Sequence, residues 1–393
     1  MSHPTISRIR RALSALDGWV EGECFRGWDP YDALNSPLLK WLTFNSRLMG
    51  IAWVQLLKRS PINLRPLLGV PKGYNPKGMG LFLASYLRYY RITGNPRHLE
   101  RAHFFARWLQ EHVSPGYSGA CWGYNFDWPN RSFFAPSGTP TLVNTVFIAR
   151  AFLDGHSWLG EEEWLNVARS ACDFILSDLN RHQEGDGLCF SYTPLDQRRV
   201  HNANVLAASL LARVASLTGE SGLLDTARRA VAYTIARQRP DGSWPYGEDR
   251  LDSWVDGYHT GFVLVALAEY RDYSGANHID ECLACGYDFY KQKCFADGWV
   301  PRFSPESLYP IDIHCVAQAI LTFCRFSGLD DKALGRAAAV AMWAIANMQD
   351  DQGSFHFQMR RHYRIRIPYM RWGQAWLFRA LTELLETLVA VEQ

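Results

Sequence analysis

Five side chains able to carry acid–base chemistry stand before two predicted apolar helices in the second half of the sequence. Asp252, Asp256 and His259 precede the helix predicted from about residue 260, and Asp312 and His314 precede the next one. Hydrolysis of a glycoside needs two carboxyl groups, one as acid and one as base or nucleophile. Lysis or epimerisation of a uronic acid needs a group that moves a proton, which suits a histidine or a tyrosine. These five residues are therefore the candidate catalytic residues.

Each of these residues also has a structural interpretation. An aspartate just before a helix commonly caps it, and this applies above all to Asp256 and Asp312. His201, His259 and His314 begin three successive predicted helices, and three imidazoles are able to bind a zinc ion with one coordination position left open. Capping and loop hydrogen bonds explain the histidines without a metal, so we expect no metal and no cofactor.

Aromatic, amide and charged residues near the same helix starts are candidates for substrate binding. Tryptophan and tyrosine offer flat apolar rings on which sugar rings stack. Basic residues, Lys77 and Arg198 among them, lie in the same loops, and the positive ends of the helices point the same way, which favours an anionic ligand. The candidates are Asp29, Asp32, Trp122, Tyr124, Asp127, Arg131, His201, Asn202, Trp254, Tyr258, Arg371 and Trp372.

Apolar and amphipathic helical segments alternate along the chain. Segments such as 142–153 are apolar nearly all round, which is typical of helices buried on most sides. Segments that follow them, such as 223–238, carry one apolar stripe and show a polar face to water. Glycine is expected just past a helix end, and the glycines at the short junctions are Gly94, Gly155, Gly219, Gly275 and Gly328.

This alternation predicts an all-α fold, an (α/α)6 toroid of six inner and six outer helices. Inner helices are predicted to start near residues 78, 141, 203, 260, 314 and 372. We expect one domain over residues 1–393, with N-terminal helices within residues 4–58 completing the outer ring. The long connections should form small β-hairpins on the face where the inner helices begin. Loops on a rigid scaffold are where function usually lies.

Composition narrows the class of protein. Of 393 residues, 48% are apolar and 20% are charged, with a net charge of +2. This balance gives no reason to expect nucleic acid or a membrane surface as the main partner. The 9 cysteines are scattered rather than arranged as a disulfide framework, and neither a secretion signal nor a long apolar run is recognisable. We therefore expect a cytoplasmic protein without an integral membrane segment.

Six strings along the chain resemble one bacterial family. They are GWDPYDALNS, CWGYNFDWPNRSFF, VHNANVLAASLLARV, RQRPDGSWPYG, YPIDIHCVAQAI and IPYMRWGQAWLFRAL, and the resemblance covers residues from about 20 to 390. The family is that of the VpsJ-type polysaccharide-biosynthesis proteins of exopolysaccharide and lipopolysaccharide clusters. The resemblance implies a role in making or trimming a surface polysaccharide and supplies no catalytic residues. Toroids of this shape include glycoside hydrolases, polysaccharide lyases and sugar epimerases, but fold does not fix function.

The first functional hypothesis is a carbohydrate-active enzyme that acts on an acidic oligo- or polysaccharide. Within it, hydrolysis with Asp312 and either Asp252 or Asp256 as the acid–base pair is preferred. Two carboxylates about 5–10 Å apart across an open cleft would favour this reaction.

Two alternatives remain open. The first is lysis or epimerisation at a uronic acid, with His259 or His314 and a tyrosine moving the proton and Arg131 or Arg371 binding the carboxylate. A His–Tyr–Arg cluster without a pair of carboxylates would favour it. The second is a non-catalytic glycan-binding or scaffold protein of the polysaccharide machinery, which a mouth closed by its own loops would favour.

Overall fold

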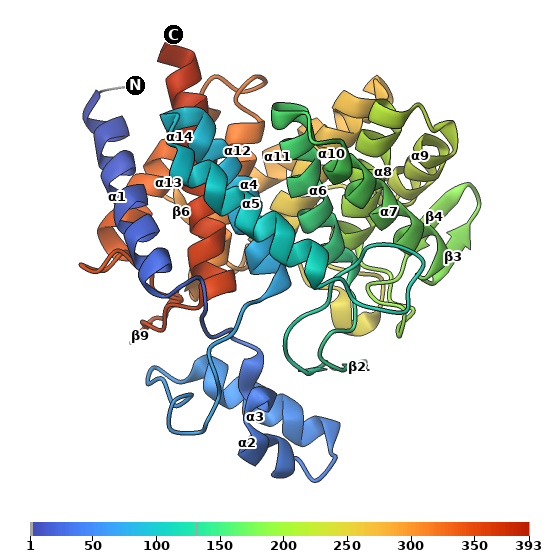
Figure 1. Cartoon of the computed structure of the whole chain (residues 1–393). Helices are drawn as coiled ribbons and strands as arrows, with labels where there is room; N and C mark the ends of the chain where they lie inside the picture. The colour runs from blue at the N-terminus through green and yellow to red at the C-terminus, as the bar shows by residue number, and fades with distance from the viewer. Residues whose placement is uncertain (1–2, 131–132, 393) are drawn as a thin grey trace.

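A computed structural model describes residues 3–130 and 133–392, which fold mostly into helices (Figure 1). Six of these helices form an inner ring. Each packs against the next, and α14 packs against α4, which closes the ring. The inner helices are α4 (Pro76–Thr93), α6 (Leu142–Leu159), α8 (His201–Thr218), α10 (Gly257–Ser274), α12 (Ile313–Arg325) and α14 (Trp376–Glu392), the last preceded by a short π-helix, η4 (Met370–Ala375). None of the helices in these described ranges is long and apolar enough to span a bilayer.

A second set of helices surrounds the ring. Each outer helix from α5 to α13 packs on the inner helix that precedes it, and α1 packs on α14 and α13. The outer helices are α1 (His3–Gly22), α5 (Pro96–Glu111), α7 (Glu162–Ser177), α9 (Ser221–Ile235), α11 (Asp280–Lys293) and α13 (Ala333–Asn347). The predicted (α/α)6 toroid is therefore confirmed.

Burial explains the two kinds of helix. In α6 every residue from Leu142 to Gly155 is buried, as expected for a helix enclosed by neighbours on all sides. Gly94, Gly219 and Gly275 end their helices in the left-handed conformation, as predicted. The junction predicted at Gly155 is wrong, because α6 continues to Leu159 and Gly160 caps it with a φ of 76°.

Small antiparallel hairpins occupy the long connections, as predicted. The strands are short, and their backbone pairing ties each loop to itself or to a neighbouring loop. They pair as β1 (Trp128–Pro129) with β2 (Phe134–Ala135), β3 (Arg181–Glu184) with β4 (Gly187–Phe190), β5 (Phe295–Ala296) with β6 (Val300–Pro301), and β7 (Ile311–Asp312) with β8 (Gln358–Met359) and β9 (Arg364–Ile365). A 3-10 turn, η2 (Arg250–Asp252), lies in the long connection before α10, and another, η3 (Asn277–Ile279), lies in the short junction between α10 and α11.

Residues 33–70 form a projection, here called the N-terminal lobe, at the bottom of Figure 1. It begins in η1 (Asp32–Asn35) and contains α2 (Pro37–Trp41) and α3 (Arg47–Arg59). Its own small core consists of Ala33, Leu39, Val54, Leu57 and Val70. Within the segment 4–58, α1 thus lies in the outer ring, whereas α3 contacts η1, α2 and β1.

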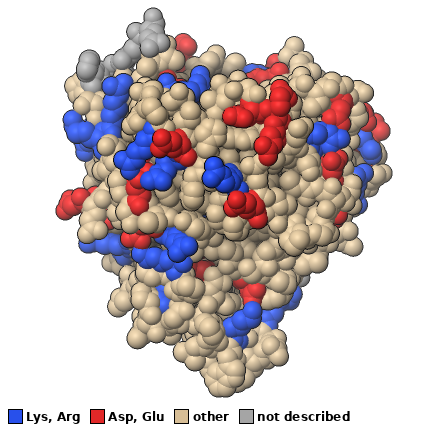
Figure 2. Space-filling model, viewed as in Figure 1, with Lys and Arg blue, Asp and Glu red and all other residues tan. Residues whose placement is uncertain are grey.

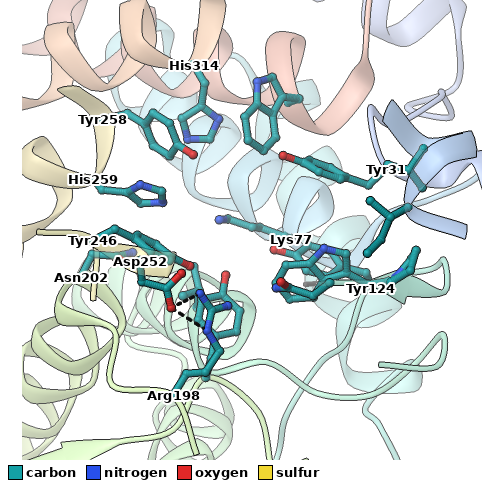
Figure 3. Close-up of a pocket in the computed structure, with 18 of the residues that line it drawn as sticks. Tyr31, Lys77, Tyr124, Arg198, Asn202, Tyr246, Asp252, Tyr258, His259 and His314 are labelled. Atoms are coloured by element: carbon teal, nitrogen blue, oxygen red, sulfur yellow. Dashed lines mark hydrogen bonds and ion pairs between the residues drawn. The ribbon is translucent and has the colours of Figure 1, made fainter. Parts of the chain in front are cut away.

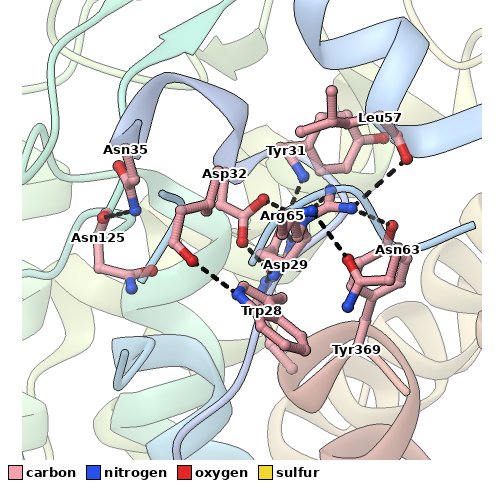
Figure 4. Close-up of polar contacts among 12 residues, drawn as sticks. Trp28, Asp29, Tyr31, Asp32, Asn35, Leu57, Asn63, Arg65, Asn125 and Tyr369 are labelled. Carbon is pink, nitrogen blue, oxygen red and sulfur yellow. Dashed lines mark hydrogen bonds and ion pairs between the residues drawn. The ribbon is translucent and has the colours of Figure 1, made fainter. Parts of the chain in front are cut away.

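Arg65 connects the N-terminal lobe to the ring (Figure 4). Its side chain is fully buried, and its Nε donates to Asp32 Oδ1 at 2.7 Å. One terminal nitrogen donates to the Tyr369 hydroxyl at 2.7 Å, and the other donates to the backbone carbonyl of Asp29 at 2.9 Å. Because Tyr369 directly precedes η4, this guanidinium joins the lobe to the start of the last inner segment.

Replacing Arg65 by methionine should destabilise the protein by about 3–5 kcal/mol, because Asp32 then stays buried without its charge partner. Urea unfolding followed by circular dichroism measures this loss. Arg47→Met, at an exposed position of the same lobe, is the matched control and should change stability by less than about 0.5 kcal/mol. A small effect of Arg65→Met would show that the lobe is held by other contacts.

Candidate functional site

A cavity of about 360 Å³ opens on the long-loop face, where the inner helices begin (Figure 3). Helix α3 of the N-terminal lobe and the long loops form the rest of its wall. The starts of all six inner helices reach it, through Lys77, Val143, Asn202, His259, His314 and, in η4 before α14, Trp372. The positive ends of the inner helices therefore converge on one space.

Aromatic rings make up much of the cavity wall. Tyr246 and Trp254 stack with ring centroids 4.6 Å apart, and Tyr124 and Phe126 stack at 5.0 Å. Such faces favour a flat ring with apolar C–H groups as ligand. The aromatic residues of the wall are Tyr31, Tyr124, Phe126, Trp128, Tyr192, Tyr246, Trp254, Tyr258, Phe262 and Trp372.

His259 lines the cavity and is held from behind by Asp256. The Asp256 carboxylate caps α10 by accepting the backbone N–H of His259 at 2.8 Å, and its second oxygen lies 2.6 Å from His259 Nδ1. The same oxygen accepts the indole N–H of Trp254 at 3.0 Å. With Nδ1 bonded to a carboxylate, the ring orientation is fixed and Nε2 is the nitrogen left to contact a ligand.

His314 lines the same cavity in a very different environment. Neither ring nitrogen has a hydrogen-bond partner among the described residues. The rings of Tyr258, Trp372 and Trp376 surround it with centroids 4.9, 4.5 and 4.7 Å away. Burial, together with the positive charges of Lys77 and Arg371, lowers the pKa of His314 well below its ordinary value. His314 is therefore a neutral imidazole at pH 7.

This environment predicts that His314 makes the protein less stable in mild acid. In the unfolded chain the histidine takes up a proton below about pH 6.5, whereas in the folded protein it stays neutral to a lower pH. Stability is then lost as the pH falls below about 6.5, by up to about 1.4 kcal/mol per pH unit for one proton.

His98 and His356 also have pKa values lowered by burial. The contribution of His314 is therefore measured by comparing the wild type with His314→Gln. The variant should show a shallower decline in urea midpoint between pH 7 and 5, and equal slopes would contradict the prediction.

Tyr258 lies between the two histidines. Its ring centroid is 4.0 Å from that of His259 and 4.9 Å from that of His314. Figure 3 shows the three side chains entering the cavity from one side, with Lys77 and Tyr124 opposite. A ligand in the cavity therefore faces two imidazoles and a phenol at once.

Lys77 is the most unusual charged residue of the cavity. It is 3% exposed, and its ammonium forms no hydrogen bond or ion pair with the residues that the structure describes. Asn75 caps α4 by accepting the backbone N–H of Lys77, which fixes the residue in the first turn. The amine then rests over Phe147 and Trp376, 4.6 and 5.2 Å from the ring centroids. Burial, and then the charge of Arg371, lowers the pKa of Lys77 well below its ordinary value.

The candidate carboxylates do not form an exposed pair. Asp252 lines the cavity, but Arg198 donates to it through Nε at 2.9 Å and through a second nitrogen. Asp312 does not line the cavity, and both of its carboxylate oxygens accept hydrogen bonds from the protein. It caps α12 by accepting the His314 backbone N–H at 2.8 Å, and it also accepts the Trp372 indole N–H at 2.9 Å and a bond from Gln358. Asp256 and Asp312 thus position His259 and Trp372 rather than face the ligand space.

The other carboxylates predicted at the mouth are buried in ion pairs. Arg371 donates to both oxygens of Asp29, at 2.6 and 2.8 Å, so its guanidinium is occupied although the residue lines the cavity. Asp32 is paired with Arg65. Two of the three guanidinium nitrogens of Arg371 are thus bonded to Asp29, whereas the sequence predicted that Arg371 binds a carboxylate of the ligand.

Three further predicted binding residues do not line the cavity, and a fourth lies outside the described residues. Trp122 is fully buried and donates its indole N–H to the Leu109 carbonyl. Asp127 forms an ion pair with Lys40 of the N-terminal lobe at 2.7 Å. His201 lies 2.6 Å from Glu248, and this hydrogen bond lowers the pKa of Glu248 to about 2. Arg131 lies outside the described residues. Of the predicted binding residues, Tyr124, Asn202, Trp254, Tyr258, Arg371 and Trp372 do line the cavity.

Several lining residues were not among the candidates. Tyr192 and Tyr246 come from the long loops, and Tyr246 follows the Asp241–Trp244 turn, which was a usable signal. Lys77 and Arg198 were recognised only as basic residues near helix starts. The α3 residues Ile51, Val54, Gln55 and Arg59 carried no signal, because nothing in the sequence placed α3 at the mouth.

Metal binding was weighed from the three histidines. Within residues 3–130 and 133–392, no group of three or more His, Cys, Asp or Glu side chains is placed to hold a metal ion. His201 is directed to Glu248 instead of the cavity. Elemental analysis of the purified protein is the test of the predicted metal-free state.

Comparison with known proteins adds information on the fold only. The sequence matches no protein-family model, and no curated protein matches it. The α-mannanase of glycoside hydrolase family 76 from Bacteroides thetaiotaomicron gives a TM-score of 0.62 at 12% identity, covering 81% of this chain and 87% of that one. Cellobiose 2-epimerase from Spirochaeta thermophila gives 0.60 at 14% identity, over 81% and 87%, and a D-mannose isomerase gives 0.62 at 11%, over 80% and 87%. The chain is thus similar in fold to carbohydrate-active toroid enzymes, both glycoside hydrolases and sugar epimerases.

Proposed function

We propose that the protein is an epimerase or lyase that acts on uronic-acid residues of an oligo- or polysaccharide. The observation that carries this proposal is a pair of histidines, His259 and His314, facing one aromatic cavity whose carboxylate, Asp252, is already ion-paired. The fold likeness to sugar epimerases and glycoside hydrolases supports a saccharide as substrate. The resemblance to VpsJ-type proteins supports a place in cytoplasmic steps of bacterial surface polysaccharide biosynthesis.

Both reactions begin with the same proton transfer. The C5–H of a uronate is acidic because the neighbouring carboxylate takes up the electron pair when the proton leaves. His259 accepts this proton at Nε2, and Asp256 stabilises the resulting imidazolium. The intermediate carries a second negative charge on the carboxylate oxygens. Lys77, which is buried at the cavity and forms no hydrogen bond or ion pair with the described residues, is suited as an ammonium ion to stabilise that charge.

The second step decides between the two products. In epimerisation a proton returns to C5 from the opposite face. His314 enters the cavity from the same side as His259 and is neutral, so this role suits the phenol of Tyr124, which lies across the cavity. In lysis the C4–O bond breaks instead, a C4=C5 double bond forms, and the leaving oxygen takes a proton. A tyrosine or histidine is able to supply that proton.

Hydrolysis, the reaction first favoured from the sequence, has less support. It needs two carboxyl groups beside the glycosidic bond, whereas Asp256 and Asp312 stand behind the cavity wall and Asp252 is bound to Arg198. A non-catalytic scaffold role has no specific support either, since the cavity is open and holds the two histidines.

The proposal is tested by incubating the protein with defined oligouronides in heavy water. Nuclear magnetic resonance should show deuterium at C5 of the uronate, with inverted configuration for an epimerase or an unsaturated end for a lyase. The same oligosaccharides reduced to neutral sugars are the control and should remain unlabelled. New reducing ends without deuterium or unsaturation would establish hydrolysis and overturn the proposal.

A further inference from the structure

Charge is unevenly distributed along this chain although the whole is nearly neutral. Residues 33–99 contain no aspartate or glutamate. Within them the N-terminal lobe carries five basic residues, and Arg47 and Arg59 among these are exposed. The nearest acid on the adjoining loop, Asp127, is already paired with Lys40. The outer surface of the lobe is therefore positive.

The same lobe exposes an unusual amount of apolar surface. Of the 20 exposed large hydrophobic side chains in the described part of the chain, eight lie within residues 38–67. Trp41, Phe44, Leu48 and Leu67 are 69, 71, 73 and 84% exposed. In Figure 2 the lowest part of the molecule, where Figure 1 places α2 and α3, is mostly uncharged surface. Soluble proteins rarely leave such patches uncovered unless they bind something.

These side chains are not a misplaced part of the core. The lobe has a complete small core of its own, which includes Leu39, Val54 and Leu57. The exposed residues lie outside it, and the rings of Trp41 and Phe44 pack against each other at 6.0 Å. The patch is thus a built surface with an outward-facing aromatic pair.

We propose that the N-terminal lobe docks on an anionic phospholipid surface, with Trp41, Phe44 and Leu48 entering the interface. Tryptophan, phenylalanine and leucine side chains insert at the boundary between lipid headgroups and acyl chains. They do so above all where basic residues surround them and acidic residues are absent. Each exposed basic residue adds electrostatic attraction to a membrane that contains anionic lipid. A docking site for another protein would not require a segment so completely free of acids.

Docking would place the cavity at the membrane. Helix α3 carries Leu48 and Leu56 on its exposed side and lines the cavity through Ile51 and Gln55. This consequence rests on the proposed function: the saccharide substrate would then be one held at the bilayer, as a lipid-linked oligosaccharide is, while its sugar enters the cavity.

The test is co-sedimentation of the full chain with vesicles. Vesicles of phosphatidylcholine with phosphatidylglycerol should bind the protein at least about tenfold more tightly than phosphatidylcholine alone, and added salt should weaken binding. The triple variant Trp41→Ser, Phe44→Ser, Leu48→Ser should lose binding. The matched control is Trp299→Ser, Tyr309→Ser, Leu329→Ser, which removes similar exposed side chains elsewhere. Arg47→Glu should weaken binding about tenfold or more, and Arg8→Glu on α1 should not.

Turnover of a free, soluble oligouronide should be unchanged in the triple variant, so a failure of docking and a failure of the proposed function give different results. No binding to anionic vesicles, or equal binding to neutral ones, would overturn the proposal. Sedimentation velocity without lipid is the further check. Self-association that the triple variant abolishes would assign the patch to a second copy of the chain instead.

Discussion

His259→Gln should abolish deuterium exchange at C5 of an oligouronide, with a loss of turnover of about 100-fold or more. Glutamine keeps a polar side chain of similar length, but it has no nitrogen that accepts a proton near pH 7. His314→Gln should behave differently. His314 is neutral and enters the cavity from the same side as His259, so this variant should keep both the exchange of C5–H with solvent and the inversion at C5.

The comparison needs a control that separates chemistry from structure. His201→Gln removes a histidine that is also buried at the start of an inner helix but is bonded to Glu248 outside the cavity. It should leave turnover of the folded protein within about threefold, because it touches no ligand. Full exchange and full inversion in His259→Gln would remove the proton-transfer role from this histidine.

The helical architecture follows directly from local patterns. Apolar segments such as 142–153 have to be enclosed on all sides, and amphipathic ones such as 223–238 have to cover them, so the ring was predictable without long-range information. The error at Gly155 has a packing cause. A Cβ there would lie 2.0 Å from the Trp164 ring, so this glycine serves a close helix contact instead of a helix end.

The site could be predicted only in part. The topology brings the starts of the inner helices together, and so His259 and His314 were correctly expected at one mouth. Which side chain of a closely spaced pair faces inward depends on partners far away in sequence. Asp312 turns to Gln358 and Trp372, whereas His314 enters the cavity. No local pattern contains those contacts.

The same limit applies to charge. Lys77 was one basic residue among several in the loops, and Arg131 or Arg371 was the predicted partner for a carboxylate. Asp29 binds Arg371 across 342 positions of sequence. Lys77 is then a buried cavity amine that forms no hydrogen bond or ion pair with the described residues. The net charge of +2 likewise concealed the acid-free N-terminal lobe, because a sum over the chain carries no information on where charges lie.

Lys77→Met should lower turnover of oligouronides by about 100- to 1000-fold, the usual effect of removing one group that stabilises developing negative charge. Methionine fills nearly the same volume and packs on Phe147 and Trp376, but it carries no charge. The loss should appear in kcat more than in KM, because the second negative charge exists only after the proton has left C5.

The stability of this variant gives a second and independent readout. A buried amine without a hydrogen-bond partner costs free energy in the folded protein, so Lys77→Met should raise the free energy of unfolding by about 1 kcal/mol or more. Lys72→Met is the matched control, since Lys72 is paired with Glu23 on the surface, and it should alter neither property. If Lys77 served the structure, its substitution would make the protein less stable. If it serves the chemistry, its substitution makes the protein less active and more stable. A Lys77→Met protein that is less stable and fully active would therefore exclude the amine from the reaction.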